Sequence, residues 1–90
     1  MNNANIEENY WDYITVYPNP TSSLVYFEIS HPDIAKIKIM DIVGKEVHSV
    51  AINDNVNIID MSSFSNGSYF FKIQDSNGRT LVSDKLLKTK

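Results

Sequence analysis

A strict alternation of apolar and polar side chains follows the turn at Gly67. Over residues 68–73, Tyr69, Phe71 and Ile73 fall on one side of an extended chain, and the residues between them fall on the other. This period of two predicts a β-strand with one face in a hydrophobic core. Glycine tolerates the positive φ that a sharp turn into the strand requires. We therefore expect a central strand to begin at this turn.

The same alternation recurs along most of the chain. Residues 24–29 and 35–41 show it most clearly. The side chains expected to point inward are Val25, Phe27 and Ile29 in the first segment, and Ala35, Ile37 and Ile39 in the second. Further strands are expected at residues 14–17, 46–52, 56–60 and 80–88. Apolar residues alternate imperfectly around 83–85, which predicts a bulge or a change of neighbouring strand there.

Turn-forming residues separate the predicted strands. Pro18 and Pro20 each remove a backbone donor, which predicts a rigid connection between the first two strands. Asn19, Thr21 and Ser22 are expected to satisfy backbone groups within that connection. Two hairpins follow along the chain. Gly44 supplies the positive φ of the first, and the Asn-Gly pair in residues 75–79 favours a turn with two positive φ values.

These strands predict an all-β protein. About seven short strands at roughly ten-residue spacing, without helical periodicity, are typical of an immunoglobulin-like antiparallel β-sandwich. In that fold Tyr69 resembles a tyrosine corner, whose hydroxyl bonds to the backbone upstream, here between Asp60 and Phe64. The alternative is an ordinary inward aromatic residue with its hydroxyl at the rim. Asp60 itself is expected to cap a tight turn.

The composition narrows the class of protein. The chain has 90 residues, which is enough for one domain with one core. Its formal net charge is -3, and nucleic-acid-binding proteins need a clustered basic surface, so we expect no nucleic-acid partner. The absence of cysteine excludes disulfides, thiolate metal sites and cysteine nucleophiles.

Residues 1–13 differ from the rest of the chain. Because residues 1–9 are rich in Asn and Glu, we expect 1–13 to be a largely disordered linker and 14–90 to be the folded domain. No apolar run has the length of a signal peptide or a membrane span. We therefore expect the chain to be part of a longer protein, with any export signal elsewhere.

Catalytic chemistry is not indicated. A nucleophile needs a base within hydrogen-bond reach, but His31 and His48 are isolated, and the aspartates are spread over separate turns. The sequence has no calcium-loop spacing, no glycine-rich phosphate loop and no histidine spacing suited to a metal. We predict no enzymatic activity, no metal and no cofactor.

Three stretches together carry a family resemblance. They are residues 17–21 with Pro-Asn-Pro, 39–47 with Asp-x-x-Gly-Lys, and 59–70 with Asn-Gly-x-Tyr, followed by a basic tail. In order and spacing they resemble the type A C-terminal sorting domain of the type IX secretion system, also called the Por secretion system. The residues that match the family motif, with an expected structural role, are Pro18, Asn19, Pro20, Asp41, Gly44, Lys45, Asp60, Gly67 and Tyr69.

The resemblance implies a function in export. Such a domain closes a longer secreted or surface protein of a Gram-negative bacterium, which crosses the inner membrane by its own signal peptide. The domain then directs its upstream cargo from the periplasm through the outer-membrane translocon to the cell surface or the medium. A surface cysteine peptidase is expected to remove the domain by cleavage in or before residues 2–9, and the cargo is joined in some cases to an anionic lipopolysaccharide.

The resemblance places recognition toward the C-terminal end. The candidate residues for contact with the translocon are Lys85, Leu86, Leu87 and Lys88. A basic and apolar edge strand can add to a sheet in a partner. Alternatively, the two leucines only close the sandwich and the lysines protect its edge. The sequence leaves both interpretations open.

A competing hypothesis is an immunoglobulin-like accessory module of an extracellular enzyme, which binds glycan or spaces domains. Its binding platform would be formed by Tyr10, Trp11 and Tyr13. We favour instead the interpretation that these aromatic residues cover one open end of the core. Glycan binding lost in Trp11→Ala would favour the module, and export of a passenger fused upstream would favour the sorting signal.

Overall fold

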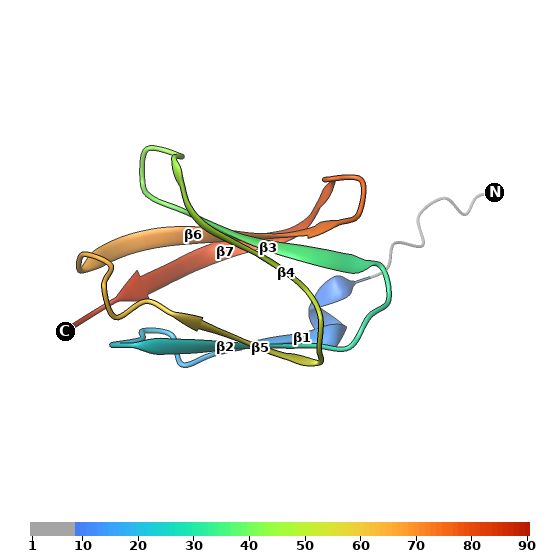
Figure 1. Ribbon diagram of the computed structural model, residues 1–90, viewed down its shortest axis with the longest axis horizontal. Helices are drawn as coiled ribbons and strands as arrows, with labels where there is room; N and C mark the ends of the chain where they lie inside the picture. Colours follow the sequence, from blue (N-terminus) through green and yellow to red (C-terminus); the bar gives the residue numbers. More distant parts are fainter. Residues whose placement is uncertain (1–8) are drawn as a thin grey trace.

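Two antiparallel sheets stacked face to face form the protein (Figure 1). The structure is a computed structural model, in which residues 9–90 are described. The smaller sheet has the order β1-β2-β5, with the strands Ile14–Tyr17, Leu24–Ile29 and Val56–Asp60. The larger sheet has the order β4-β3-β6-β7, with the strands Glu46–Ala51, Ile34–Met40, Gly67–Asp75 and Thr80–Lys88. The predicted all-β sandwich is confirmed.

The hydrophobic core lies between the inner faces of the two sheets. The alternation predicted for β2 and β6 is confirmed by the buried side chains Val25, Phe27, Ile29, Tyr69, Phe71 and Ile73. Phe27 and Phe71 meet edge to face across the core, with their ring centroids 5.2 Å apart. This geometry is one that aromatic pairs favour. The two central strands therefore anchor the sheets to each other.

The strand register differs from the sequence prediction at two places. At the start of β3, Ile34 rather than Ala35 is buried, because the pairing with β6 shifts there by one residue. The prediction of a bulge or a change of neighbouring strand around residues 83–85 is wrong. Pairing of β7 with β6 is continuous from Val82 onward, and the shift lies between Val82 and Thr80. Such slips decide which side chains reach the core.

The two hairpins of the larger sheet use the same turn. In the β3–β4 turn the N–H of Gly44 donates to the carbonyl of Asp41 at 3.0 Å, and Asp41 Oδ1 accepts from the N–H of Lys45 at 2.9 Å. Residues 75–79 repeat both bonds. Gly44 and Gly78 have φ values of +88° and +85°, and no described non-glycine residue has a positive φ. The prediction for Gly44 is confirmed. The second turn has one positive φ rather than the predicted two.

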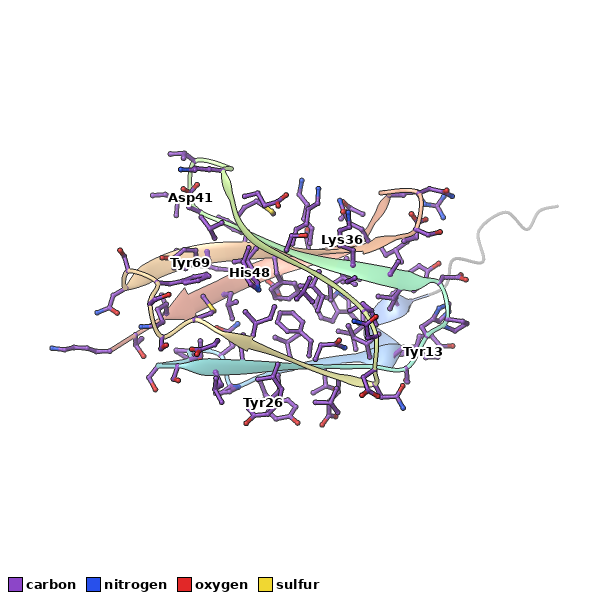
Figure 2. All side chains as sticks on the ribbon, viewed as in Figure 1. Tyr13, Tyr26, Lys36, Asp41, His48 and Tyr69 are labelled. Atoms are coloured by element: carbon purple, nitrogen blue, oxygen red, sulfur yellow. The ribbon has the colours of Figure 1, made fainter. Side chains whose placement is uncertain are left out.

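The corner between β5 and β6 contains the predicted tyrosine corner. Gly67 has a φ of +142°, and the hydroxyl of Tyr69, a residue labelled in Figure 2, donates to the carbonyl of Ser65 at 2.7 Å. The acceptor lies one residue beyond the stretch 60–64 in which it was expected. Phe64 packs against the Tyr69 ring, with centroids 5.5 Å apart. The corner is thereby closed by both a hydrogen bond and an aromatic contact.

A short 3-10 helix, η2 at Tyr10–Tyr13, precedes β1 and packs on the sandwich. Asn9 caps it, since its Oδ1 accepts from the N–H of Trp11 at 3.1 Å. The Trp11 ring stands edge-on to Phe71 at 6.1 Å, so it covers one end of the core, as we expected. These four residues therefore belong to the folded unit rather than to the predicted linker. Residues 1–8, the rest of that linker, lie outside the described residues.

Candidate functional site

The Pro-Asn-Pro connection between β1 and β2 lies against the outer edge of β7. Asn19 Nδ2 donates to the carbonyl of Lys85 at 2.9 Å, and Asn19 Oδ1 accepts from the N–H of Leu87 at 3.0 Å. The N–H of Thr21 donates to the carbonyl of Leu87 at 2.9 Å, and the N–H of Thr89 donates to the carbonyl of Thr21 at 2.8 Å. We call these four hydrogen bonds the β7 clamp. They bond to the backbone groups at the outer edge of β7 near its end, as a neighbouring strand would.

Sequence reasoning missed the β7 clamp. We expected Asn19 and Thr21 to satisfy nearby backbone groups, and the Thr21 hydroxyl does so by donating to the carbonyl of Leu24 at 2.6 Å. The Asn19 side chain instead bonds to Lys85 and Leu87, which lie 66 and 68 positions further along the chain. Both prolines of the connection follow cis peptide bonds. The sequence offers one hint of the β7 clamp. An asparagine amide carries both a donor and an acceptor, which match the C=O and N–H groups at the edge of a strand.

The motif residues gather at one end of the sandwich (Figure 1). They are Pro18, Asn19 and Pro20 in the connection, Asp41, Gly44 and Lys45 in the β3–β4 turn, and Asp60, Gly67 and Tyr69 at the β5–β6 corner. The strand register accounts for this, because Met40 pairs with Phe70 near the start of β6, and Gly67 pairs with Lys88 at the end of β7. We call this the motif end. η2 and the β6–β7 turn lie at the opposite end.

The motif end presents both apolar and charged side chains to solvent. Ile42 and Val43 at the tip of the β3–β4 turn are highly exposed, although apolar residues are unusual in such a position. At the corner, the hydroxyl and N–H of Ser62 bond to the Asp60 carboxyl and hold its pKa below the usual value. Asp60 is therefore a charged cap of the turn, as predicted.

The aromatic residues of η2, at the opposite end, pack edge-on against neighbouring rings. The rings of Tyr10 and Tyr13 meet His31 at interplanar angles of 70° and 71°, and the Trp11 ring meets Phe71 at 77°. These rings therefore stand steeply on His31 and Phe71. Such packing fits a cover for the core.

The described residues do not gather a set of metal ligands, and their two histidines lie in different surroundings. Within residues 9–90, no group of three or more His, Cys, Asp and Glu side chains is placed to hold a metal ion. His31 packs between Tyr10 and Tyr13, whereas His48 of β4 lies beside Phe64. The two histidines therefore belong to different aromatic clusters.

A comparison with known protein families finds one family that matches the sandwich. A family model described as the secretion system C-terminal sorting domain matches residues 15–89. The chain belongs to this family of type IX sorting domains. The match begins within β1 and ends one residue after β7, so it covers nearly the whole sandwich. A search among curated proteins found no match. The predicted resemblance is confirmed.

Membership of the family defines the function in outline. A sorting domain of this family is a C-terminal signal for type IX secretion, and it is not itself catalytic. It implies interaction with the secretion system and export toward the cell surface or the medium. In residues 9–90, no helix is long and apolar enough to cross a membrane.

The last strand of the sorting domain presents fewer groups than we expected. Leu86 is fully buried in the core. Lys88 is also buried, and its Nζ donates to Asn66 Oδ1 at 3.4 Å. The outward backbone groups along this stretch are occupied by the β7 clamp. Strand addition here is thus closed in the folded domain, and the side chains that a partner can reach are Lys85 and Leu87.

Replacing Asn19 by alanine is expected to lower the free energy of unfolding of the sorting domain by about 1–2 kcal/mol, because two hydrogen bonds of the β7 clamp are lost. Urea denaturation measures this change. Asn53→Ala is the matched control, since Asn53 is exposed in a turn and should shift stability by less than about 0.5 kcal/mol. Equal losses in both variants would contradict a stabilising role of the clamp.

Proposed function

We propose that this sorting domain directs an upstream cargo in the same chain through the outer-membrane translocon of the type IX system. At the surface, a cysteine peptidase removes the domain, or the domain is used to attach the cargo to the cell. The observation that supports the proposal is the motif end, where three stretches far apart in sequence lie at the same end of the sandwich (Figure 1).

The position of the cargo is compatible with access to the motif end. η2, the first described element, lies at the opposite end of the sandwich from the motif end (Figure 1). A cargo joined before Tyr10 is therefore attached at the end of the sandwich that lies away from the motif end. Cleavage in or before residues 2–9, which rests on the family resemblance, would release the domain without cutting any of its strands.

The contact surface that we propose lies on the outer face of β7 at the motif end. Lys85 is exposed, and Leu87 is half-buried on the same face. In the neighbouring strand, Phe70 pairs with Lys85 and is also exposed. The cation steers a partner of opposite charge toward this face, and the exposed apolar side chains beside it are buried when the partner binds. Specific interfaces combine these two contributions.

Export of a passenger protein tests the proposal. A periplasmic passenger with its own signal peptide is fused before residues 1–90 and expressed in a bacterium with a type IX system. We expect delivery to the surface or the medium. The double variant Lys85→Glu and Leu87→Gln should leave most of the passenger in the periplasm, while the melting temperature of the isolated domain stays nearly unchanged.

The control is Ser49→Glu, which adds a charge to the outer face of the same sheet but on β4, away from β7. It should be exported normally. Deletion of residues 86–90 should also block export, but this deletion removes buried Leu86 and part of the β7 clamp, so it cannot separate unfolding from lost recognition. Normal export of the double variant would refute the proposed contact surface.

A further inference from the structure

The edge strands of the sandwich differ in how they are protected. An open edge exposes unpaired N–H and C=O groups, and folded proteins cover such edges or interrupt them. β7 is covered from Lys85 onward by the β7 clamp, and β1 has only four residues. β4 contains a register shift opposite Ile39 and Met40, which is the irregularity of a β-bulge. β5 pairs with β2 in continuous register and has neither a bulge nor a covering loop among the described residues.

The hydrogen-bond register identifies the free backbone groups of β5. The N–H of Ile29 donates to the carbonyl of Asn55, and the N–H of Met61 donates to the carbonyl of Ser23, both at 2.8 Å. Hydrogen-bonded pairs alternate along an antiparallel ladder. The odd-numbered residues of β5 therefore bond to β2. Its even-numbered residues, Val56, Ile58 and Asp60, direct their backbone groups away from the sheet.

Exposed apolar side chains accompany this free edge. Val56 and Ile58 are 45% and 55% exposed, and β5 contains neither the lysine nor the proline that commonly protects an edge. Ile58 pairs with Tyr26, which pairs with Tyr17. The two tyrosine rings are stacked at 5.3 Å, and Tyr26 points away from the sandwich (Figure 2). An apolar row thus crosses the outer face and ends at the open edge.

The charges on the two outer faces are segregated. None of the three strands of the smaller sheet contains Lys or Arg, and the charged residues that they expose are Glu28 and Asp60. The cations lie on the larger sheet, where Lys36 and Lys72 belong to its outer face. Figure 2 shows Lys36 extending from that side. The Glu28 carboxylate accepts from the hydroxyl of Tyr17 on the β1 side, so Asp60 is the carboxylate at the β5 edge. A partner at β5 therefore meets this carboxylate and two exposed apolar side chains, and positive charge on the side of the partner that faces them is favoured.

We propose that β5 is a docking site for an extended segment of a partner polypeptide in which apolar and basic residues alternate. Because alternate side chains of a strand point to opposite faces, its basic residues face outward, beside Val56, Ile58 and Asp60, and its apolar residues face the inner side, beside Ile59. The segment adds as a fourth strand of the smaller sheet and bonds to the backbone of Val56, Ile58 and Asp60. Backbone pairing supplies affinity, and side chains supply specificity. A second copy of the chain fits less well, because it brings another face whose only charges are carboxylates. The inference does not depend on the export function.

Binding of designed peptides to the whole chain tests this site. The probe is a nine-residue peptide in which valine alternates with lysine, and its control has glutamate in place of every lysine. With the lysine peptide, the amide protons of Val56, Ile58 and Asp60 should become protected from hydrogen exchange. The glutamate peptide should bind at least about tenfold more weakly. Equal binding of both peptides would refute the proposed charge preference.

Proline variants locate the binding edge. Ile58→Pro removes an N–H that makes no bond within the sheet, so it should abolish peptide binding while the domain stays folded. Ser83→Pro is the matched control on the outer edge of β7, beyond the β7 clamp, and should bind normally. If Ile58→Pro unfolds the domain, Ile58→Lys replaces it and should weaken binding of the lysine peptide. Unchanged peptide binding in the folded Ile58 variant would overturn the proposal. The proposal would also be overturned if the chain forms a dimer and the Ile58 variant is a monomer, because the edge would then bind a second copy of the chain.

Discussion

Phe71→Ala is expected to lower the free energy of unfolding by about 3–5 kcal/mol. Phe71 is 1% exposed, and its ring contacts both Phe27 and Trp11. Its removal leaves a cavity between two sheets whose strands cannot easily collapse into the space. A small domain has a total stability of roughly 5–15 kcal/mol, so a large part of it would be lost. Urea denaturation with linear extrapolation measures the change.

Phe70→Ala is the matched control for this prediction. It makes the same chemical change one residue earlier, on the outer face of β6, where the side chain is 42% exposed. Because little buried surface is lost, the free energy of unfolding should fall by less than about 1 kcal/mol. If both variants unfold at the same urea concentration, the assignment of inner and outer faces in β6 is wrong.

Leu86→Ala should have the second largest effect, a loss of about 2–5 kcal/mol in the free energy of unfolding. Leu86 is 0% exposed and pairs with Tyr69 of the tyrosine corner. Thermal denaturation should show a clear decrease in melting temperature. The reason is again a cavity in the core, here beside the residue that closes the corner.

Leu87→Ala provides the comparison within the same strand. Leu87 lies on the outer face, so its replacement should change the stability by less than about 1 kcal/mol. In the export assay, Leu86→Ala should reduce export because the domain is destabilised, whereas Leu87→Ala should reduce export without a comparable loss of stability. A decrease in melting temperature that is as large for Leu87→Ala as for Leu86→Ala would show that the outer-face assignment is wrong.

The family motif is largely a set of structural devices. Gly44 and Gly67 supply positive φ values, Asp60 caps a turn, and Asn19 holds the end of β7. Each of them positions backbone at the motif end instead of presenting a reactive group. This explains how a sequence can match a secretion family closely while the residues that contact the secretion system lie beside the motif, as we propose for Lys85 and Leu87.

Features that depend on near neighbours in the chain were predictable from the sequence. The alternation around Phe27 and Phe71 determines which face of each strand is apolar, because side chains alternate with a period of two. Turn chemistry is equally local, so Gly44 could be assigned a positive φ and Asp60 a cap. The type IX family could be recognised for the same reason, since its motif consists mainly of these turns.

The tertiary structure decided what depends on pairing between distant segments. The contact of Asn19 with Lys85 and Leu87, the burial of Lys88 and the open edge of β5 all follow from strand order and register. Periodicity does not encode these properties, because a strand alternates in the same way whichever strand lies beside it. The sequence by itself thus determined the strands, their faces and the family. Only the fold determined which edges are closed and which side chains a partner can reach.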